Sequence, residues 1–192
     1  NDFGTIGRKS TKRNLRSHQL RHAGLIDHPW EIFMYKGVKY GFCAFAPNAL
    51  TVSIKDIKKA VNIVHNLDSL CDIVIVSFHA GGEGVEYQNV TRKTEYYIGE
   101  NRGNVYEFAH KVIDAGADVL LGHGPHVPRA VEVYKDRFIA YSMGNFLTYS
   151  RISIAGKCGI APIFHIFTDK KGRFLEAQII PTYQQKYQAP KL

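Results

Sequence analysis

Two short apolar runs, each followed at once by glycine and histidine residues, constrain the fold of this chain most strongly. Residues 72–78 and 118–121 have the length and near-continuous apolar character of strands that are buried on both faces. An amphipathic helical pattern precedes each apolar run. The apolar positions of the first helical pattern are Ile54, Ile57, Val61 and Val64, and those of the second are Val105, Phe108, Ala109, Val112 and Ile113. This alternation predicts an α/β domain with a mixed β-sheet core flanked by helices.

Local signals place further elements around these units. Residues 5–23 are expected to form a basic helix that ends at Gly24, and Ser53 is expected to cap the next helix, with Asp56 in its first turn. Three hairpins are predicted, at residues 30–35 and 38–42, 130–134 and 138–142, and 161–168 and 173–181. With 192 residues, residues 1–192 are expected to form a single domain.

Polar side chains follow both apolar runs where each strand is expected to end. His79 comes directly after the first run, with Glu83 four residues on, and His123 and His126 follow the second. Active sites of open α/β sheets lie at such strand ends, and neutral imidazole is a ligand of Mn, Fe and Zn. The three histidines are therefore candidate ligands of a divalent metal ion, and Glu83, in the Gly-rich polar segment 79–103, is a candidate catalytic residue that acts as a general base or orients a ligand. The alternative of hydrogen-bonded structural histidines stays open.

Other polar residues give weaker indications. Asn145 is a candidate for contacting a substrate or orienting a ligand, next to the alternative that its segment is only a strand ending in a turn. His165 alternates with apolar residues on an expected strand and is predicted to be a hydrogen-bonded core residue. A Ser-His-Asp triad has no supporting local motif, because the chain contains no Gly-X-Ser-X-Gly elbow.

Positive charge is concentrated near the start of the chain. The net charge is +8, and residues 8–21 contain no acid but the six basic residues Arg8, Lys9, Lys12, Arg13, Arg16 and Arg21. A solvated helix face is the favoured interpretation, followed by a docking surface for an anionic polymer or a phosphate-bearing substrate. Nucleic acid is disfavoured, because no aromatic side chains for stacking on bases are interleaved with these charges.

Targeting and redox signals are sparse. No apolar run is long enough for a transmembrane helix, and the first residues, 1–4, lack the pattern of a signal peptide. The three cysteines, Cys43, Cys71 and Cys158, show no Cys-X-X-Cys spacing, which argues against both a disulfide framework and a structural zinc site. Cys43 and Cys71 are interpreted as buried thiols, and a single disulfide stays open.

Several segments resemble the CapA-type bacterial capsule (poly-γ-glutamate) synthesis family. Residues 114–126, DAGADVLLGHGPH, are similar to the family pattern AGAD…GHHPH, and residues 132–146 are similar to EVYKG…IAYSLGNF. Residues 79–83 resemble HWGxE, and residues 2–7 resemble DYGxxG. The resemblance covers nearly the whole chain.

This resemblance implies a calcineurin-like metallophosphoesterase fold and a role in making or exporting poly-γ-glutamate capsule at the bacterial cell envelope, outside the cytoplasm. By the resemblance, His79, His123 and His126 match histidines expected at a metal site, Glu83 the adjacent acid, and Asn145 the motif asparagine. The implied partners are an anionic polymer or a phosphoester substrate, and other capsule-synthesis proteins.

The departures from the family pattern leave two functions open. The early GD and NNH motifs do not occur, so the chain resembles the C-terminal portion of a longer protein without its N-terminal metal-site motifs. Gly124 stands where GHHPH has its second histidine, and Ala80 where HWG has tryptophan. One function is a metal-dependent hydrolase of a phosphoester, or of another ester or amide. The other is a non-catalytic binding protein for an anionic envelope polymer, with a degenerate metal site.

Overall fold

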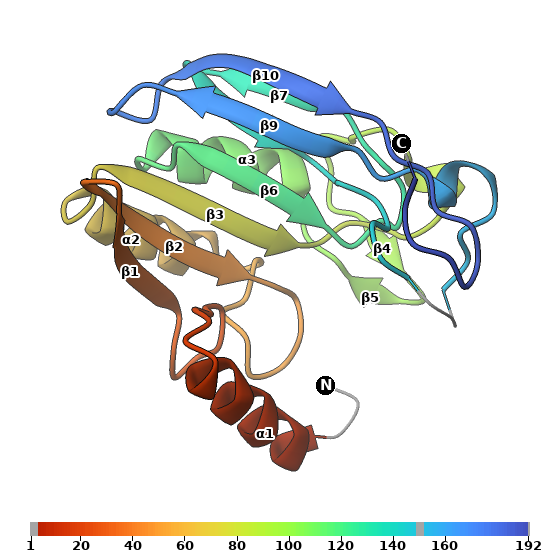
Figure 1. The fold of residues 1–192 in the computed structure, drawn as a ribbon, viewed down its shortest axis with the longest axis horizontal. Coiled ribbons are helices and arrows are strands. Elements are labelled where there is room, and N and C mark those ends of the chain that lie inside the picture. The colour runs from red at the N-terminus through yellow and green to blue at the C-terminus, as the bar shows by residue number, and fades with distance from the viewer. Residues whose placement is uncertain (1–3, 149–151, 192) are drawn as a thin grey trace.

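A six-stranded mixed sheet organises the molecule (Figure 1), and the computed structural model describes residues 4–148 and 152–191. Along the sheet the strands are β1 (Trp30–Tyr35), β2 (Val38–Phe45), β3 (Ile73–His79), β6 (Val119–His123), β8 (Arg137–Ala140) and β7 (Val131–Tyr134). The four inner strands are parallel, and β1 and β7 pair antiparallel at the two edges. The mixed α/β sheet and two of the predicted hairpins are thereby confirmed.

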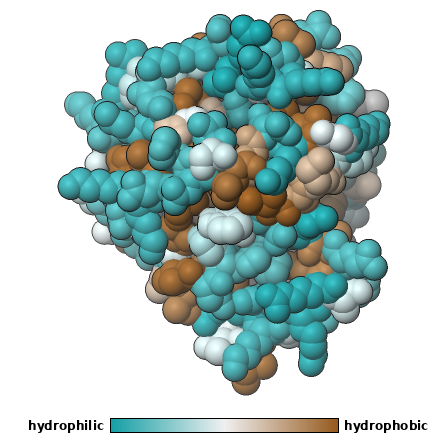
Figure 2. Space-filling model, turned by 90° about the vertical axis from the view of Figure 1, so that its left-hand side faces the viewer, coloured by the Kyte–Doolittle hydropathy of each residue, from teal (hydrophilic) through white to brown (hydrophobic). Residues whose placement is uncertain are grey.

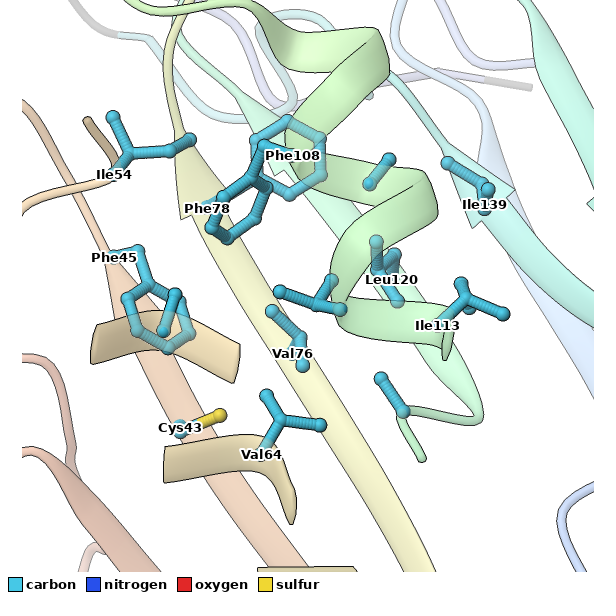
Figure 3. Close-up of a cluster of buried hydrophobic side chains, with 14 of the residues drawn as sticks. Cys43, Phe45, Ile54, Val64, Val76, Phe78, Phe108, Ile113, Leu120 and Ile139 are labelled. Carbon is cyan, nitrogen blue, oxygen red and sulfur yellow. The ribbon is translucent and has the colours of Figure 1, made fainter. Parts of the chain in front are cut away.

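Helices α2 (Ile57–Asp68) and α3 (Val105–Asp114) cover one face of this sheet. Figure 3 shows that side chains from the two helices and from β2, β3 and β6 point into one apolar core. The Phe108 ring lies at its centre, with ring centroids 5.3 Å from Phe45 and 5.6 Å from Phe78. The helical periodicity of the sequence therefore correctly predicted which faces of α2 and α3 are buried against the sheet.

The first turn of α2 differs from the prediction. Asp56, not Ser53, is the N-cap residue, and its carboxylate accepts a hydrogen bond of 3.0 Å from the backbone N–H of Lys59. Ser53 accepts from the N–H of Lys55 in the turn that precedes the helix. The N-cap of α3 follows the same rule, since the Asn104 side chain accepts from the N–H of Glu107.

Helix α1 (Gly4–Ser17) ends earlier than predicted. Gln19 adopts a φ of +55° and donates its N–H to the carbonyl of Arg16, while Leu20 donates to the carbonyl of Leu15. These two bonds satisfy the last carbonyls of the helix in a Schellman motif. The prediction of a helix that runs to Gly24 was wrong because glutamine occupies the left-handed position that usually carries glycine.

A separate hairpin, β9 (Ile163–Thr168) and β10 (Phe174–Ile180), packs on the other face of the sheet (Figure 1). Its inward residues, Phe164, Ile166, Phe174 and Ala177, contact a cluster formed by Val119, Phe138 and Ala140. His165 lies on the exposed side of β9, so its prediction as a core residue was wrong. Both sides of the strand carry apolar residues, and the alternation alone did not tell which side faces inward.

The segment between β3 and α3 contains the 3₁₀ turn η1 (Val85–Tyr87) and two very short paired strands, β4 (Tyr96–Tyr97) and β5 (Glu100–Asn101). A second 3₁₀ turn, η2 (Gly156–Gly159), precedes β9. Among the described residues, no helix has both the length and the apolar character needed to cross a bilayer. Cys43, Cys71 and Cys158 are all free, and burial raises the pKa of the Cys43 thiol.

Candidate metal centre at the strand ends

The parallel register of β3 and β6 places two of the candidate histidines side by side. His79 and His123 are the last residues of their strands and pair directly across the sheet. Their neighbours Phe78 and Gly122 face the helices, so the two imidazoles project from the opposite face. The short hairpin β4–β5 lies beyond the ends of these strands (Figure 1). Strand pairing thus joins residues that are 44 positions apart in the sequence.

The electrostatic surroundings keep both imidazoles neutral at pH 7. Burial, together with the charges of Arg102, His123 and His126, lowers the pKa of His79 to about 4. Burial also lowers the pKa of His123. Neutral imidazole is the form that binds a metal ion, because protonation blocks the donor lone pair.

His126 is held in place by Asn145, the residue predicted to contact a substrate or orient a ligand. The Asn145 side-chain nitrogen donates to the backbone carbonyls of His126 and Cys158, each at 3.1 Å, and this fixes the orientation of the amide. Its oxygen lies 2.7 Å from Nδ1 of His126 and accepts the imidazole proton. The lone pair of His126 is therefore on Nε2. Asn145 itself is buried, with 6% of its surface exposed.

Glu83 lies within reach of this group from the loop after β3. One of its carboxylate oxygens, Oε1, accepts a hydrogen bond of 2.5 Å from Arg102, and the other, Oε2, lies 3.7 Å from Nε2 of His126. The same Nη2 atom of Arg102 lies 3.4 Å from Nε2 of His79. The structure thus brings His79, His123, His126 and Glu83 to one end of the sheet.

A fully buried ion pair anchors the loop that carries Glu83. Arg129 and Glu95 form two parallel hydrogen bonds of 3.1 and 2.7 Å, and their side chains are 0% and 3% exposed. Glu95 also accepts from the backbone N–H of Gly82, next to Glu83, and Arg129 donates to the carbonyl of Tyr87. Because these contacts join residues from three parts of the chain, they fix the loop over the strand ends.

Arg102, Glu95 and Arg129 were not predicted from the sequence. Glu95 and Arg102 lie in a polar segment where charged residues are expected, and no local spacing distinguishes them. Only Arg129 had a position that could have drawn attention to it, because it lies two residues before the start of β7. A charged side chain that becomes buried beside a strand needs a partner. The identity of that partner, 34 residues away, has no sequence signature.

The side chains at the strand ends are of the types that bind metal ions, but they provide only part of a ligand set. Three imidazoles and one carboxylate are appropriate donors for Mn, Fe or Zn. In residues 4–148 and 152–191, however, no three His, Cys, Asp or Glu side chains gather closely enough to hold an ion. The guanidinium of Arg102, rather than another carboxylate, contacts both His79 and Glu83.

A family model of the bacterial capsule synthesis protein PGA_cap matches residues 1–150 of the sequence. The chain belongs to this family. The PGA_cap match includes β3, β6 and all five predicted site residues. The resemblance to capsule synthesis proteins is therefore confirmed.

Curated relatives agree with this assignment. The chain is 26% identical over 165 residues to the capsule biosynthesis protein CapA of Bacillus anthracis, which covers 76% of this chain and 37% of that relative. It is 37% identical over 76 residues to the PGA biosynthesis protein CapA of Bacillus subtilis (strain 168), or 40% of this chain and 17% of the relative. The chain thus spans little more than a third of the length of the first of these two relatives and less of the second.

A solved structure shares the fold. The putative 5′-nucleotidase from Staphylococcus aureus, determined in complex with alpha-ketoglutarate, aligns with a TM-score of 0.55 and 12% sequence identity. The alignment covers 91% of this chain and 35% of that protein. At this identity the likeness concerns the fold alone, and it supports the predicted metallophosphoesterase-like architecture.

Proposed function

We propose that this PGA_cap chain takes part in the synthesis of a bacterial capsule or envelope polymer outside the cytoplasmic membrane, as part of a metal-dependent hydrolase. Its substrate would be a phosphoester, or another ester or amide, and its metal a divalent Mn, Fe or Zn ion. The observation that carries the proposal is the hydrogen bond between Asn145 and His126, which directs the lone pair of His126 to Nε2. Metal-binding histidines are oriented by acceptors of this kind.

The residues at the strand ends have distinct roles in this proposal. His79, His123 and His126 would supply part of the ligand set of the metal, which would lower the pKa of a bound water and polarise the bond to be cleaved. Asn145 is a positioning residue, since it keeps the proton of His126 on Nδ1. Glu83 is the general base: Oε1 is held by Arg102, while Oε2 accepts no hydrogen bond from Arg102 and can take a proton. Further ligands would come from other parts of the longer family proteins.

Metal analysis of the purified chain tests this function. After incubation with Mn²⁺, Fe²⁺ or Zn²⁺ and dialysis, we expect about one or two ions per chain by elemental analysis. His123→Ala should lose the metal, because it removes a donor, whereas His65→Ala, at an exposed position on α2, should keep it. Asn145→Ala should bind metal about 10–100-fold more weakly.

The outcome separates the two functions left open by the sequence. Stoichiometric metal that His123→Ala loses supports the hydrolase and directs a screen of phosphoester substrates. No bound metal, or equal metal in wild type and His123→Ala, would rule out these histidines as ligands in this chain.

A second function, the binding of an anionic envelope polymer without catalysis, is favoured by the surface of α1. Lys9, Arg13 and Arg16 are exposed and lie on one side of this helix, which has no acidic residue. Lys12 is already paired with Asp27 at 2.7 Å. Helix α1 extends away from the sheet (Figure 1), and the lower part of the molecule, where α1 lies, is largely hydrophilic in Figure 2. Such a surface suits a polyanion.

Charge reversal on α1 tests polymer binding. The triple variant Lys9→Glu, Arg13→Glu, Arg16→Glu should lose most of its affinity for poly-γ-glutamate, and wild-type binding should weaken as salt is raised. The matched control reverses Lys36, Lys170 and Lys171, three exposed lysines in hairpin turns, and changes the net charge equally. Equal loss in both variants would show that only the overall charge acts, which contradicts a specific role for α1.

A further inference from the structure

Arg102 is a cation within the strand-end group, where its guanidinium contacts both Glu83 and His79. It directly follows β5, and its backbone donates to the carbonyl of Glu95 and accepts from the N–H of Gly81. These bonds tie Arg102 to the loop after β3, so its position does not depend on the side chain alone. The side chain is only 9% exposed and reaches Glu83 and His79. A guanidinium at this depth needs acceptors for its five N–H donors.

The acceptors that Arg102 has do not use all of these donors. Nη2 donates to Glu83, and Nη1 donates at 3.2 Å to Glu100, whose side chain is 72% exposed. Nε is buried and makes no hydrogen bond to any residue in the described part of the chain. An unpaired buried N–H is costly and uncommon in folded proteins. The site therefore has a donor for which the described residues provide no acceptor.

We propose that Arg102 binds an oxyanion of the ligand that this site receives, a phosphoryl or carboxylate group, through Nε together with Nη2. The carboxylate of Glu83 already occupies Nη2, which shows that an oxyanion fits against this part of the guanidinium. Glu83 uses only one donor, whereas an oxyanion with two or more oxygens accepts from two donors at once. The incoming group thus replaces Glu83 at Arg102 and releases its carboxylate toward His126, 3.7 Å away.

This inference deepens the proposed function, because it names the group of the substrate that the same site recognises and frees the proposed general base when substrate binds. It does not need a bound metal to be tested. The other buried arginine in this region, Arg129, is unsuited to the role, since Nε and both of its terminal nitrogens already donate to Glu95 and to Tyr87.

Binding of inorganic phosphate and of glutarate to the full chain, by calorimetry with and without Mn²⁺, tests the inference. Phosphate represents a phosphoryl group, and glutarate represents a carboxylate. We expect Arg102→Gln to weaken binding of the preferred anion at least about tenfold, and Arg102→Lys to restore part of it. Arg92→Gln is the matched control, because the Arg92 side chain is exposed and lies over the Tyr106 ring, 4.8 Å from its centroid.

Glu83→Gln distinguishes ligand binding from a structural role of Arg102. Removing the internal carboxylate should strengthen phosphate or glutarate binding, since the anion no longer competes with Glu83. Equal anion binding by wild type and Arg102→Gln, no binding of either anion to wild type, or weaker binding by Glu83→Gln would each overturn the inference. Loss of metal binding without loss of anion binding would contradict the proposed function and leave the role of Arg102 intact.

Discussion

Arg129→Met is expected to lower the free energy of unfolding by about 3–5 kcal/mol, because it leaves the carboxylate of Glu95 buried without its countercharge. Glu95 is 3% exposed at its side chain and would retain only hydrogen bonds from Gly82 and Thr91. Methionine keeps much of the apolar stem of arginine, so the loss reports on the charge rather than on a cavity. The loop that carries Glu83 should loosen at the same time, since Arg129 also donates to Tyr87.

Urea unfolding followed by circular dichroism measures this effect, with Arg173→Met as the matched control. Arg173 is paired with Asp169 at 2.8 Å but is 61% exposed, so its replacement should change stability little. The double variant Arg129→Met, Glu95→Gln should be more stable than Arg129→Met alone, because no buried charge remains. Equal stability of Arg129→Met and Arg173→Met would contradict this account.

Much of the fold was predictable because it rests on short-range periodicity. The apolar runs became β3 and β6, and the helical patterns became the buried faces of α2 and α3. The errors occurred where the local sequence was compatible with two different structures. Ser53 and Asp56 are both competent caps, and the chain uses the one that allows Ile54 to enter the core before the helix begins.

The candidate site was predictable to the extent that parallel strands end at the same edge of a sheet. Glu83 and Asn145 were candidates from their own segments and from the family resemblance, and the strand rule brought His79 next to His123. It did not identify Arg102 or the Arg129–Glu95 pair, because these contacts depend on how a 25-residue polar segment, residues 79–103, folds back over the strand ends. Such contacts follow from the tertiary structure and not from any local pattern.

Gly124→Ala should be the second strongly destabilising change, with an expected loss of about 2–5 kcal/mol in the free energy of unfolding. Gly124 has a φ of +119°, which side-chain-bearing residues rarely adopt. An added Cβ atom would lie 2.7 Å from the carbonyl oxygen and 3.0 Å from the nitrogen of Ala80. This backbone cannot yield easily, because the N–H of Ala80 donates to the carbonyl of His123.

Gly99→Ala separates the two causes of the lost stability, which are the unfavourable positive φ and the contact of the added Cβ with Ala80. Gly99 also has a positive φ, +74°, but its added Cβ would meet nothing within 4 Å, so we expect only the conformational cost of about 1–2 kcal/mol. Because Gly124 links His123 to the turn that holds His126, Gly124→Ala should also reduce metal binding, whereas Gly99→Ala should not. Equal losses of stability in the two variants would show that the contact with Ala80 is unimportant. A larger loss at Gly124 would explain why this chain has glycine where GHHPH has histidine: the exits of β3 and β6 approach too closely there for any side chain.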